Sequence, residues 1–596
     1  MVRIRQTFSN TIYMFRVVWR FNKSLFWGRL SESALNGIIA PLNAYILKVL
    51  VEEITNLNWN GALITISVIA IINLINGILH AYISRKLGVL NDLFKNYLMF
   101  DFNSKVVSMD YEILYEPDMI QKKDIALKAI QEDRATKYID IIFSCVSYVI
   151  TLISVIYLLS SFSWWVYLVI FILCAIKIYT VIVDKKHSYD TTVEMAPINT
   201  EISYYMNMLI DESYVNDMRM FSISKWVISK YNKCITRTHK LIEKLLSVVF
   251  KNSVVRSLLS TLETVLLYVF VATQMIFNGM SFADFTLVTS TLRTFSKSIT
   301  NITRSLIDIG ENSAYVQIYR QFMAVKNKIA VPNKGINIED LSDCVYSFRI
   351  ENLSFKYPGA KTNTLENLSL NIEKGKFYVI VGKNGVGKTT LVKLLCRLYD
   401  PSTGSIKYMN SDLRTIEYRS YRDNIGVVFQ DYKYYCLSIA ENIAMNDYDD
   451  TTETLDRISN ALKEAGLGEK IKSLPKGMHT QLGKIFDNEG ILLSGGELQK
   501  LALARVLFKD PSVVILDEPS SALDALAENE LIETFNTALK GKTVFYISHR
   551  LSVAKYADKV IFMDDKNVKG FDTHEKLFKN IDEYRVMYES QAKHYQ

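Results

Sequence analysis

Cysteine is scarce in this chain of 596 residues, and the placement of its six cysteines excludes two common kinds of site. No two of them have the CxxC spacing that zinc sites use, and two lie in long apolar stretches, so neither a zinc site nor a disulfide framework is indicated. The N-terminal residues also lack a short apolar segment followed by a small-residue cleavage site. We therefore expect a protein suited to a reducing compartment, without a removable signal peptide.

A large excess of charge is also missing, since the net charge is +7 and the pI is near 8.7. Loop lysines and arginines on the inner face of a membrane account for this small positive net charge. We therefore expect no nucleic-acid partner. The apolar fraction of 49% is ordinary, but the long apolar stretches lie in the first half, and the second half has the pattern of a soluble α/β domain. The distribution predicts a membrane protein with a soluble domain on the cytosolic side.

Six stretches approach the length of about 20 mainly apolar residues that a spanning helix needs. They are 25–50, 61–84, 139–160, 164–183, 254–277 and 282–302. Four ionisable residues lie in or near them, namely Glu32, His80, Glu263 and Arg293. Because an ionisable group in a membrane is costly, each is expected either to face a cavity and contact cargo or to pair with another of the four. The sequence leaves both alternatives open.

The charges of the loops predict the orientation in the membrane. The expected outer loops, 51–60, 161–163 and 278–281, contain no lysine or arginine, whereas the N-terminal arm and the connections 85–138 and 184–253 are rich in both. By the positive-inside rule, the N-terminus, both long connections and the second half of the chain are cytoplasmic.

Both long connections show helical periodicity of apolar residues, so the membrane helices are expected to continue as amphipathic helices into the cytosol. Breaks are expected at Glu116-Pro117 and at Ala196-Pro197, because proline disfavours a helical residue before it. The result is a pair of cytosolic hairpins. Their tips, near 111–118 and 211–221, are expected to press on the soluble domain.

The most informative stretch is 377–390, in which an apolar run leads through a glycine-rich turn into a helix. Gly382, Gly387, Lys388 and Thr389 fill the pattern GxxxxGK[ST]. In this pattern the glycines let backbone N–H groups converge on phosphate oxygens at a helix N-terminus. Lys388 is expected to reach the β- and γ-phosphates of a nucleotide, and the Thr389 hydroxyl to hold Mg²⁺.

Three further segments offer side chains for the same chemistry. The buried-strand run 513–516 ends in Asp517 and Glu518, which we assign to the metal and to the general base. Gln430 follows the apolar run 425–429 and is expected to contact metal and water. His549 follows the run 543–547 and is expected to donate to the γ-phosphate.

A second helix N-terminus suited to phosphate begins at Ser494, Gly495 and Gly496, ahead of the helical run 498–508. One domain therefore offers two phosphate-binding termini for one nucleotide. This duplication suggests that each terminus contacts the ATP of a different protomer.

In this order, the motifs resemble those of an ABC ATPase: aromatic loop, Walker A, Q-loop, signature, Walker B, D-loop and switch histidine. The resemblance implies ATP and Mg²⁺ as cofactors, with Tyr357 stacked on the adenine and Thr389, Gln430 and Asp517 at the metal. It assigns the following residues to the nucleotide: Tyr357, Gly382, Asn384, Gly385, Gly387, Lys388, Thr389, Thr390, Ser494, Gly495, Gly496 and Asp524. One departure is Glu497, where the signature usually has glutamine, and we expect it to alter only the rate.

With six spans ahead of it, the chain resembles an exporter-type half transporter. The implied fold is a membrane all-α domain of six transmembrane helices with long cytosolic extensions, followed by an α/β P-loop ATPase domain of ABC type. The expected divisions are a transmembrane domain over 1–325, a linker over 326–340 and a nucleotide-binding domain over 341–596. The implied location is the plasma membrane, in contact with lipid and in a cell of bacterial type.

The segments 426–443, 481–494 and 517–524 are similar to those of the lantibiotic and bacteriocin peptide exporters. That resemblance implies a homodimer with peptide cargo, while a heterodimer with a degenerate partner remains open. Some such exporters carry an N-terminal cysteine peptidase, which we do not expect here because no cysteine precedes Cys145. The alternatives are a lipid flippase, a multidrug exporter or a soluble ABC protein that acts on ribosomes or DNA, and the last of these lacks membrane spans.

Overall fold

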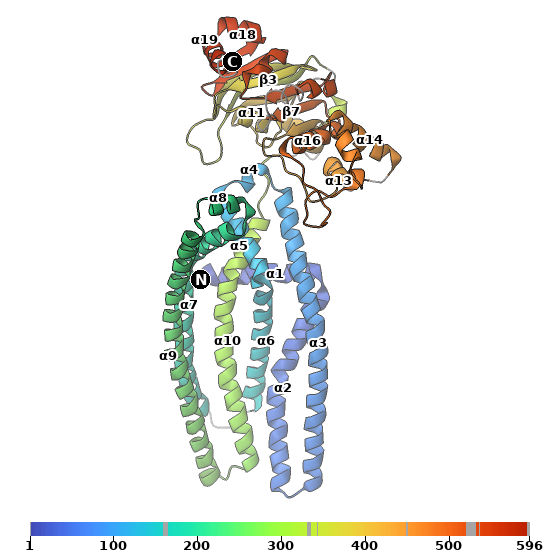
Figure 1. The fold of residues 1–596 in the computed structure, drawn as a ribbon. Coiled ribbons are helices and arrows are strands. Elements are labelled where there is room, and N and C mark those ends of the chain that lie inside the picture. Colours follow the sequence, from blue (N-terminus) through green and yellow to red (C-terminus); the bar gives the residue numbers. More distant parts are fainter. Residues whose placement is uncertain are drawn as a thin grey trace. The chain divides into compact units, whose positions relative to one another are not determined.

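The computed structural model describes residues 2–158, 165–329, 335–341, 344–446, 448, 451–519, 532–535 and 537–592. The chain divides into two compact units (Figure 1). The first comprises Met1–Ser108 and Ile120–Val325, and the second comprises Met109–Met119 and Lys326–Gln596. The expected outer loop 161–163, the centre of the expected linker and Asp524 lie outside the described residues.

Helices build the first unit, and most of them are long. They are α1 (Val2–Phe21), α2 (Lys23–Thr55), α3 (Trp59–Ser108), α5 (Pro117–Gln131), α6 (Arg134–Leu158), α7 (Trp165–Ile210), η1 (Glu212–Tyr214), α8 (Val215–Met220), α9 (Ser224–Asn278) and α10 (Phe282–Met323). Within the described residues, every stretch expected to span the membrane is helical. Four helices, α2, α3, α6 and α9, are long and apolar enough in the described part of the chain to cross a bilayer, and the total of six spans stays a prediction.

The expected continuation of the helices past their apolar stretches is confirmed by α3 and α9, which have 50 and 55 residues against the roughly 20 that a membrane crossing needs. The break at Glu116-Pro117 is also found, since α5 begins at Pro117. The break at Ala196-Pro197 was wrong, because α7 runs through Pro197 to Ile210. A proline removes only one helical hydrogen bond, and α7 keeps its path by packing along α9 (Figure 1).

Close helix packing in the first unit depends on one small residue. A Cβ atom at Gly37 of α2 would lie 2.8 Å from the Ser147 carbonyl oxygen of α6. The Thr151 hydroxyl, also from α6, donates a 3.0 Å hydrogen bond to the Gly37 carbonyl. Glycine therefore lets the two backbones approach, as small residues do between membrane helices.

The ionisable residues of the membrane stretches mostly pair with partners that the sequence pattern did not single out. Glu32 accepts a 2.9 Å hydrogen bond from Arg29, which also lies 2.8 Å from Asp140. Glu263 forms a buried ion pair with Lys177. Among the four residues themselves, only His80 approaches another, with its Nε2 atom 3.9 Å from Glu32.

Two sheets form the centre of the second unit. In the described residues, the antiparallel sheet has the order β2 (Leu365–Glu373), β1 (Tyr346–Phe355), β4 (Thr403–Tyr408) and β5 (Ser411–Asp412). The other sheet has the order β10 (Asn567–Asp572), β9 (Lys559–Asp564), β3 (Phe377–Gly382), β8 (Thr543–Ile547), β7 (Val513–Asp517) and β6 (Ile425–Val428). From β9 to β6 all neighbours are parallel, so the carboxyl ends of β3, β8, β7 and β6 meet at one edge.

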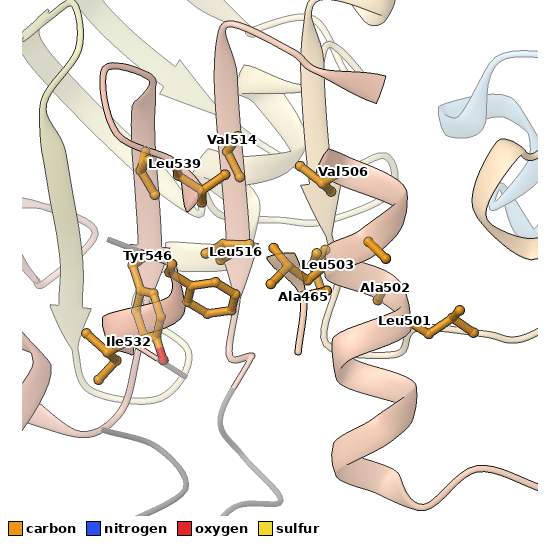
Figure 2. Close-up of a cluster of buried hydrophobic side chains, with 14 of the residues drawn as sticks. Ala465, Leu501, Ala502, Leu503, Val506, Val514, Leu516, Ile532, Leu539 and Tyr546 are labelled. Carbon is orange, nitrogen blue, oxygen red and sulfur yellow. The ribbon is translucent and has the colours of Figure 1, made fainter. Parts of the chain in front are cut away.

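Helices cover the parallel sheet. They are α11 (Lys388–Leu395), α12 (Tyr418–Asp423), α13 (Ile439–Ala444), α14 (Thr452–Glu464), α15 (Gly468–Lys472), α16 (Gly495–Lys509), α18 (His574–Asn580) and α19 (Asp582–Ala592), with short 3₁₀ turns η2 (Ile338–Asp340), η3 (Leu413–Thr415), η4 (Gly477–His479) and η5 (Leu551–Tyr556). Figure 2 shows Leu503 and Val506 of α16 beside Val514 and Leu516 of β7, all buried. This apolar contact fixes α16 against the sheet whose edge carries the predicted site.

The first hairpin tip belongs to the second unit. Its short helix α4 (Tyr111–Leu114) places the Tyr111 ring 5.6 Å from the Tyr399 ring. Beside it, Asp110 Oδ2 accepts hydrogen bonds of 2.6 and 2.8 Å from the backbone N–H groups of Lys328 and Ile329. The expected packing of this tip on the soluble domain is therefore confirmed, while that of the tip at 211–221 stays a prediction.

Candidate functional site

The glycine-rich turn between β3 and α11 has the backbone that the motif predicts. Gly382, Gly385 and Gly387 have φ angles of 156°, 81° and 105°, in the region that favours glycine. A Cβ atom at Gly382 would lie 2.2 Å from the Met563 carbonyl oxygen. The turn follows a central strand at the carboxyl edge of the parallel sheet, which is where such folds bind ligands.

Lys388 is the first residue of α11, and its side chain lies inside this turn. It is 5% exposed, and its Nζ atom donates to the Gly382 and Lys383 carbonyl oxygens at 2.7 and 3.0 Å. Burial lowers the pKa of the Lys388 ammonium, and the charges of Glu518 and Asp517 oppose that shift. A buried cation held by loop carbonyls is suited to bind phosphate oxygens.

Asp517 ends β7 and is 1% exposed. Burial is the main cause that raises its pKa, to about 6, and the Glu518 charge adds to the rise, whereas a hydrogen bond from Thr389 and the Lys388 charge oppose it. Its Oδ1 atom has no hydrogen-bond partner among the described residues. A buried carboxylate oxygen without a partner, next to a threonine hydroxyl, fits the oxygen ligands that Mg²⁺ prefers.

Glu518, Gln430 and His549 come together from three adjacent strand ends. The Glu518 Oε2 atom accepts a 2.9 Å hydrogen bond from Gln430 Nε2, and Glu518 Oε1 contacts His549 Nε2. Glu518 has a φ of 52°, in the left-handed region that costs strain in a residue with a side chain, and its side chain is 9% exposed. The strained backbone and two contacts hold one carboxylate beside the phosphate loop.

Tyr357 reaches the same loop from the antiparallel side. Its hydroxyl lies 3.0 Å from the Thr390 hydroxyl, and its ring packs 5.0 Å from Phe355 and 5.4 Å from Tyr399. The structure therefore brings the predicted adenine contact to the helix that follows the phosphate loop, and its stacking on the base stays a prediction.

Ser494 is the N-cap of α16 and forms a capping box with Glu497. The Ser494 N–H donates to Glu497 Oε2 at 2.8 Å, and Lys470 of α15 forms an ion pair with Glu497 Oε1. The Lys470 ammonium holds the pKa of the Glu497 carboxyl below its usual range. The glutamate at this position thus organises the first turn of α16, and its charge is paired with that of Lys470.

Sequence reasoning missed two supporting residues. Lys470 gave no motif signal, although a lysine that faces the first turn of α16 balances the unusual Glu497. Gln591 of α19 donates a 2.7 Å hydrogen bond to the His549 carbonyl oxygen and accepts one of 2.8 Å from the Leu551 N–H. A glutamine near the end of the chain belongs to no pattern, so only tertiary contacts reveal that it fixes the histidine segment.

Comparison with known proteins agrees with this geometry. Residues 365–521 match the family described as ABC transporter. The subtilin transport ATP-binding protein SpaT of Bacillus subtilis is 28% identical over 97% of this chain and 93% of its own length. The nisin transport ATP-binding protein NisT of Lactococcus lactis is 39% identical over 45% of each chain. The putative multidrug export ATP-binding/permease protein YgaD of Bacillus subtilis is 38% identical over 41% of this chain and 40% of its own.

The fold also has a solved counterpart. The structure of a bacterial Atm1-family ABC exporter with ATP bound superposes with a TM-score of 0.78 at 20% identity. The superposition covers 97% of this chain and 99% of the other. At this identity the likeness concerns the fold, and it includes the helical unit as well as the sheets.

Proposed function

Since this chain carries the ATP-binding domain of an ABC transporter in the fold of an ABC exporter, we propose that it exports a ribosomally synthesised, modified peptide from the cytoplasm. The observation that carries the peptide assignment is the similarity to the subtilin transport protein, which extends over nearly the whole of both chains. The similarity to the nisin transport protein covers 45% of this chain, about the size of the soluble domain, and so carries less weight for cargo. We place the N-terminus and the ATPase domain in the cytoplasm and the helices in the plasma membrane, on the loop charges given above.

Each residue of the site has a role in ATP hydrolysis under this proposal. Lys388 and the backbone N–H groups of the phosphate loop bind the β- and γ-phosphates, and Thr389, Gln430 and Asp517 hold Mg²⁺. Glu518 takes a proton from the water that attacks the γ-phosphorus, and His549 donates to a γ-phosphate oxygen, so the products are ADP and phosphate. Bound Mg²⁺ supplies charge neutralisation on the phosphates.

We also propose a homodimer, in which Ser494, Gly495, Gly496 and Asp524 of one protomer complete the ATP site of the other. Lys388→Ala and Ser494→Ala would then disable opposite halves of a site. In a dimer of one variant with the other, both lesions fall in one site and the second site is whole. Mixing the two inactive proteins should restore up to about half the specific activity in mixed dimers, as measured by phosphate release.

The control for this mixture is each variant mixed with a second preparation of itself, which should stay inactive. Co-purification of two differently tagged variants reports that subunits have exchanged. Exchange without recovered activity would contradict the shared site and would favour hydrolysis by each chain alone.

The export function is tested in cells that produce a candidate modified peptide together with the transporter. Cells with the wild-type transporter should release this peptide into the medium, and cells with Glu518→Gln should retain it inside, because hydrolysis drives the transport cycle. Mass spectrometry of medium and cytosol measures both pools. Equal release by the two strains would remove peptide export as the function.

A lipid flippase or multidrug exporter is the second candidate, because multidrug proteins also match this chain. Those matches cover 41% and 45% of the chain, about the size of the soluble domain alone, so they carry less weight for cargo. ATPase activity in nanodiscs separates the candidates. Stimulation by lipids or by diverse hydrophobic drugs, and not by the peptide, would favour this second reading.

A further inference from the structure

The helices of the first unit enclose two cavities that share one face of α10. The first cavity, of about 390 Å³, lies between α2, α6 and α10, and the second, of about 320 Å³, lies between α7, α9 and α10. Lys297 and Asn301 line both cavities. These two residues are four positions apart and therefore lie on the same face of α10.

The first cavity is electrically balanced. Arg29 lies between two carboxylates, at 2.9 Å from Glu32 and 2.8 Å from Asp140, and Lys297 offsets the remaining negative charge. The other lining residues are mainly hydroxyl and amide side chains from α2, α6 and α10. Such a wall suits polar groups.

The second cavity has an excess of positive charge. Its lining includes four cations and one carboxylate, namely Lys177, Arg256, Arg293, Lys297 and Glu263. Lys177 is paired with Glu263, and Arg256 lies 2.6 Å from Asp184. In the described part of the chain, Arg293 and Lys297 form no ion pair with a carboxylate, and the Arg293 guanidinium lies 6.0 Å from the centre of the Tyr268 ring.

We propose that Lys297 and Arg293 bind a carboxylate group of the exported peptide in the second cavity. Arg293 and Lys297 are exposed side chains that line this cavity, and no carboxylate of the described residues supplies either with a counter-charge. A peptide carboxylate supplies it and accepts charge-assisted hydrogen bonds from both cations. The assignment rests on the proposed peptide export and names the part of the cargo that this protein recognises.

The test uses the full-length protein in nanodiscs of zwitterionic lipid and a pair of acetylated, amidated peptides. The two peptides are identical except that one carries glutamate where the other carries glutamine. The wild-type protein should bind the glutamate peptide about tenfold more tightly, the scale of one charge-assisted hydrogen bond. Lys297→Gln and Arg293→Gln should each abolish most of this preference, whereas Lys297→Arg should keep it.

Lys244→Gln is the matched control, since Lys244 is an exposed cation of α9 that lines neither cavity. It should leave the preference between the peptides unchanged. The melting temperature of each variant in nanodiscs reports whether it is folded, and Lys297→Arg keeps the test valid if a neutral variant is unstable.

Three outcomes overturn the inference. Equal binding of both peptides by the wild-type protein would remove carboxylate recognition and leave peptide export intact. A preference that persists in both glutamine variants would show that other residues bind the peptide carboxylate. Binding of neither peptide, together with a loss of ATPase stimulation by anionic lipid in Lys297→Gln, would identify a lipid phosphate as the ligand and would contradict the proposed function itself.

Discussion

Glu518→Gln is expected to lower the rate of ATP hydrolysis by about two orders of magnitude or more, the usual scale for loss of a general base. The carboxylate accepts a hydrogen bond from Gln430 and contacts His549, and its left-handed backbone holds it at the end of β7. Glutamine has the same shape and can still accept from Gln430, but it takes no proton from water. ATP affinity should therefore remain close to that of the wild-type protein.

The measurement combines steady-state phosphate release with equilibrium binding of a fluorescent ATP analogue. Glu366→Gln is the matched control, because Glu366 lies on β2, is exposed and forms only a surface ion pair with Lys566. It should change neither quantity. Turnover within a few-fold of wild type in Glu518→Gln would show that another group takes the proton.

Lys177→Met is expected to destabilise the protein by about 3–5 kcal/mol, because it leaves a buried carboxylate without its partner. The side chains of Lys177 and Glu263 are only 7% and 9% exposed, and they join α7 to α9. Lys177 Nζ also lies 3.4 Å from the Ser296 hydroxyl of α10, so three helices meet at this ammonium. With the cation gone, the buried Glu263 carboxylate loses its ion pair.

The double variant Lys177→Met, Glu263→Leu distinguishes the effect of the unpaired charge on stability from the effect of altered packing. It removes both charges and should recover most of the stability lost in the single variant, since apolar replacement of a buried pair is often neutral. Unfolding by denaturant in detergent micelles gives the stability of the wild-type protein, the single variant and the double variant. A double variant that is less stable than Lys177→Met would show that packing, and not the unpaired charge, dominates here.

Much of the site followed from sequence because its geometry is local. The turn 382–387 requires positive φ angles at glycines within six residues, and the acidic pair stands directly at the end of one strand. A short sequence pattern therefore predicts both features. The proline rule failed at Pro197 because a local preference competes with packing along a whole helix, and the packing prevailed.

Contacts between residues far apart in the chain could not be predicted from any sequence pattern. Lys470 with Glu497, Gln591 with the His549 backbone and Arg29 with Asp140 join residues that are 27, 42 and 111 positions apart, and no periodicity links such positions. Geometry answered whether the four ionisable membrane residues pair with one another: His80 approaches Glu32, whereas Glu263 pairs with Lys177 of another helix.

By itself, the sequence determined the order of the motifs and the apolar stretches, because each depends on neighbouring residues or on composition, whereas the orientation in the membrane stays a prediction from the loop charges. Only the tertiary structure decided which cations have a counter-charge. Lys177 and Lys297 look alike in sequence, but Lys177 meets Glu263, whereas Lys297 lines two cavities on α10. The free energy of a charge depends on what surrounds it in space, and folding brings those surroundings together from distant parts of the chain.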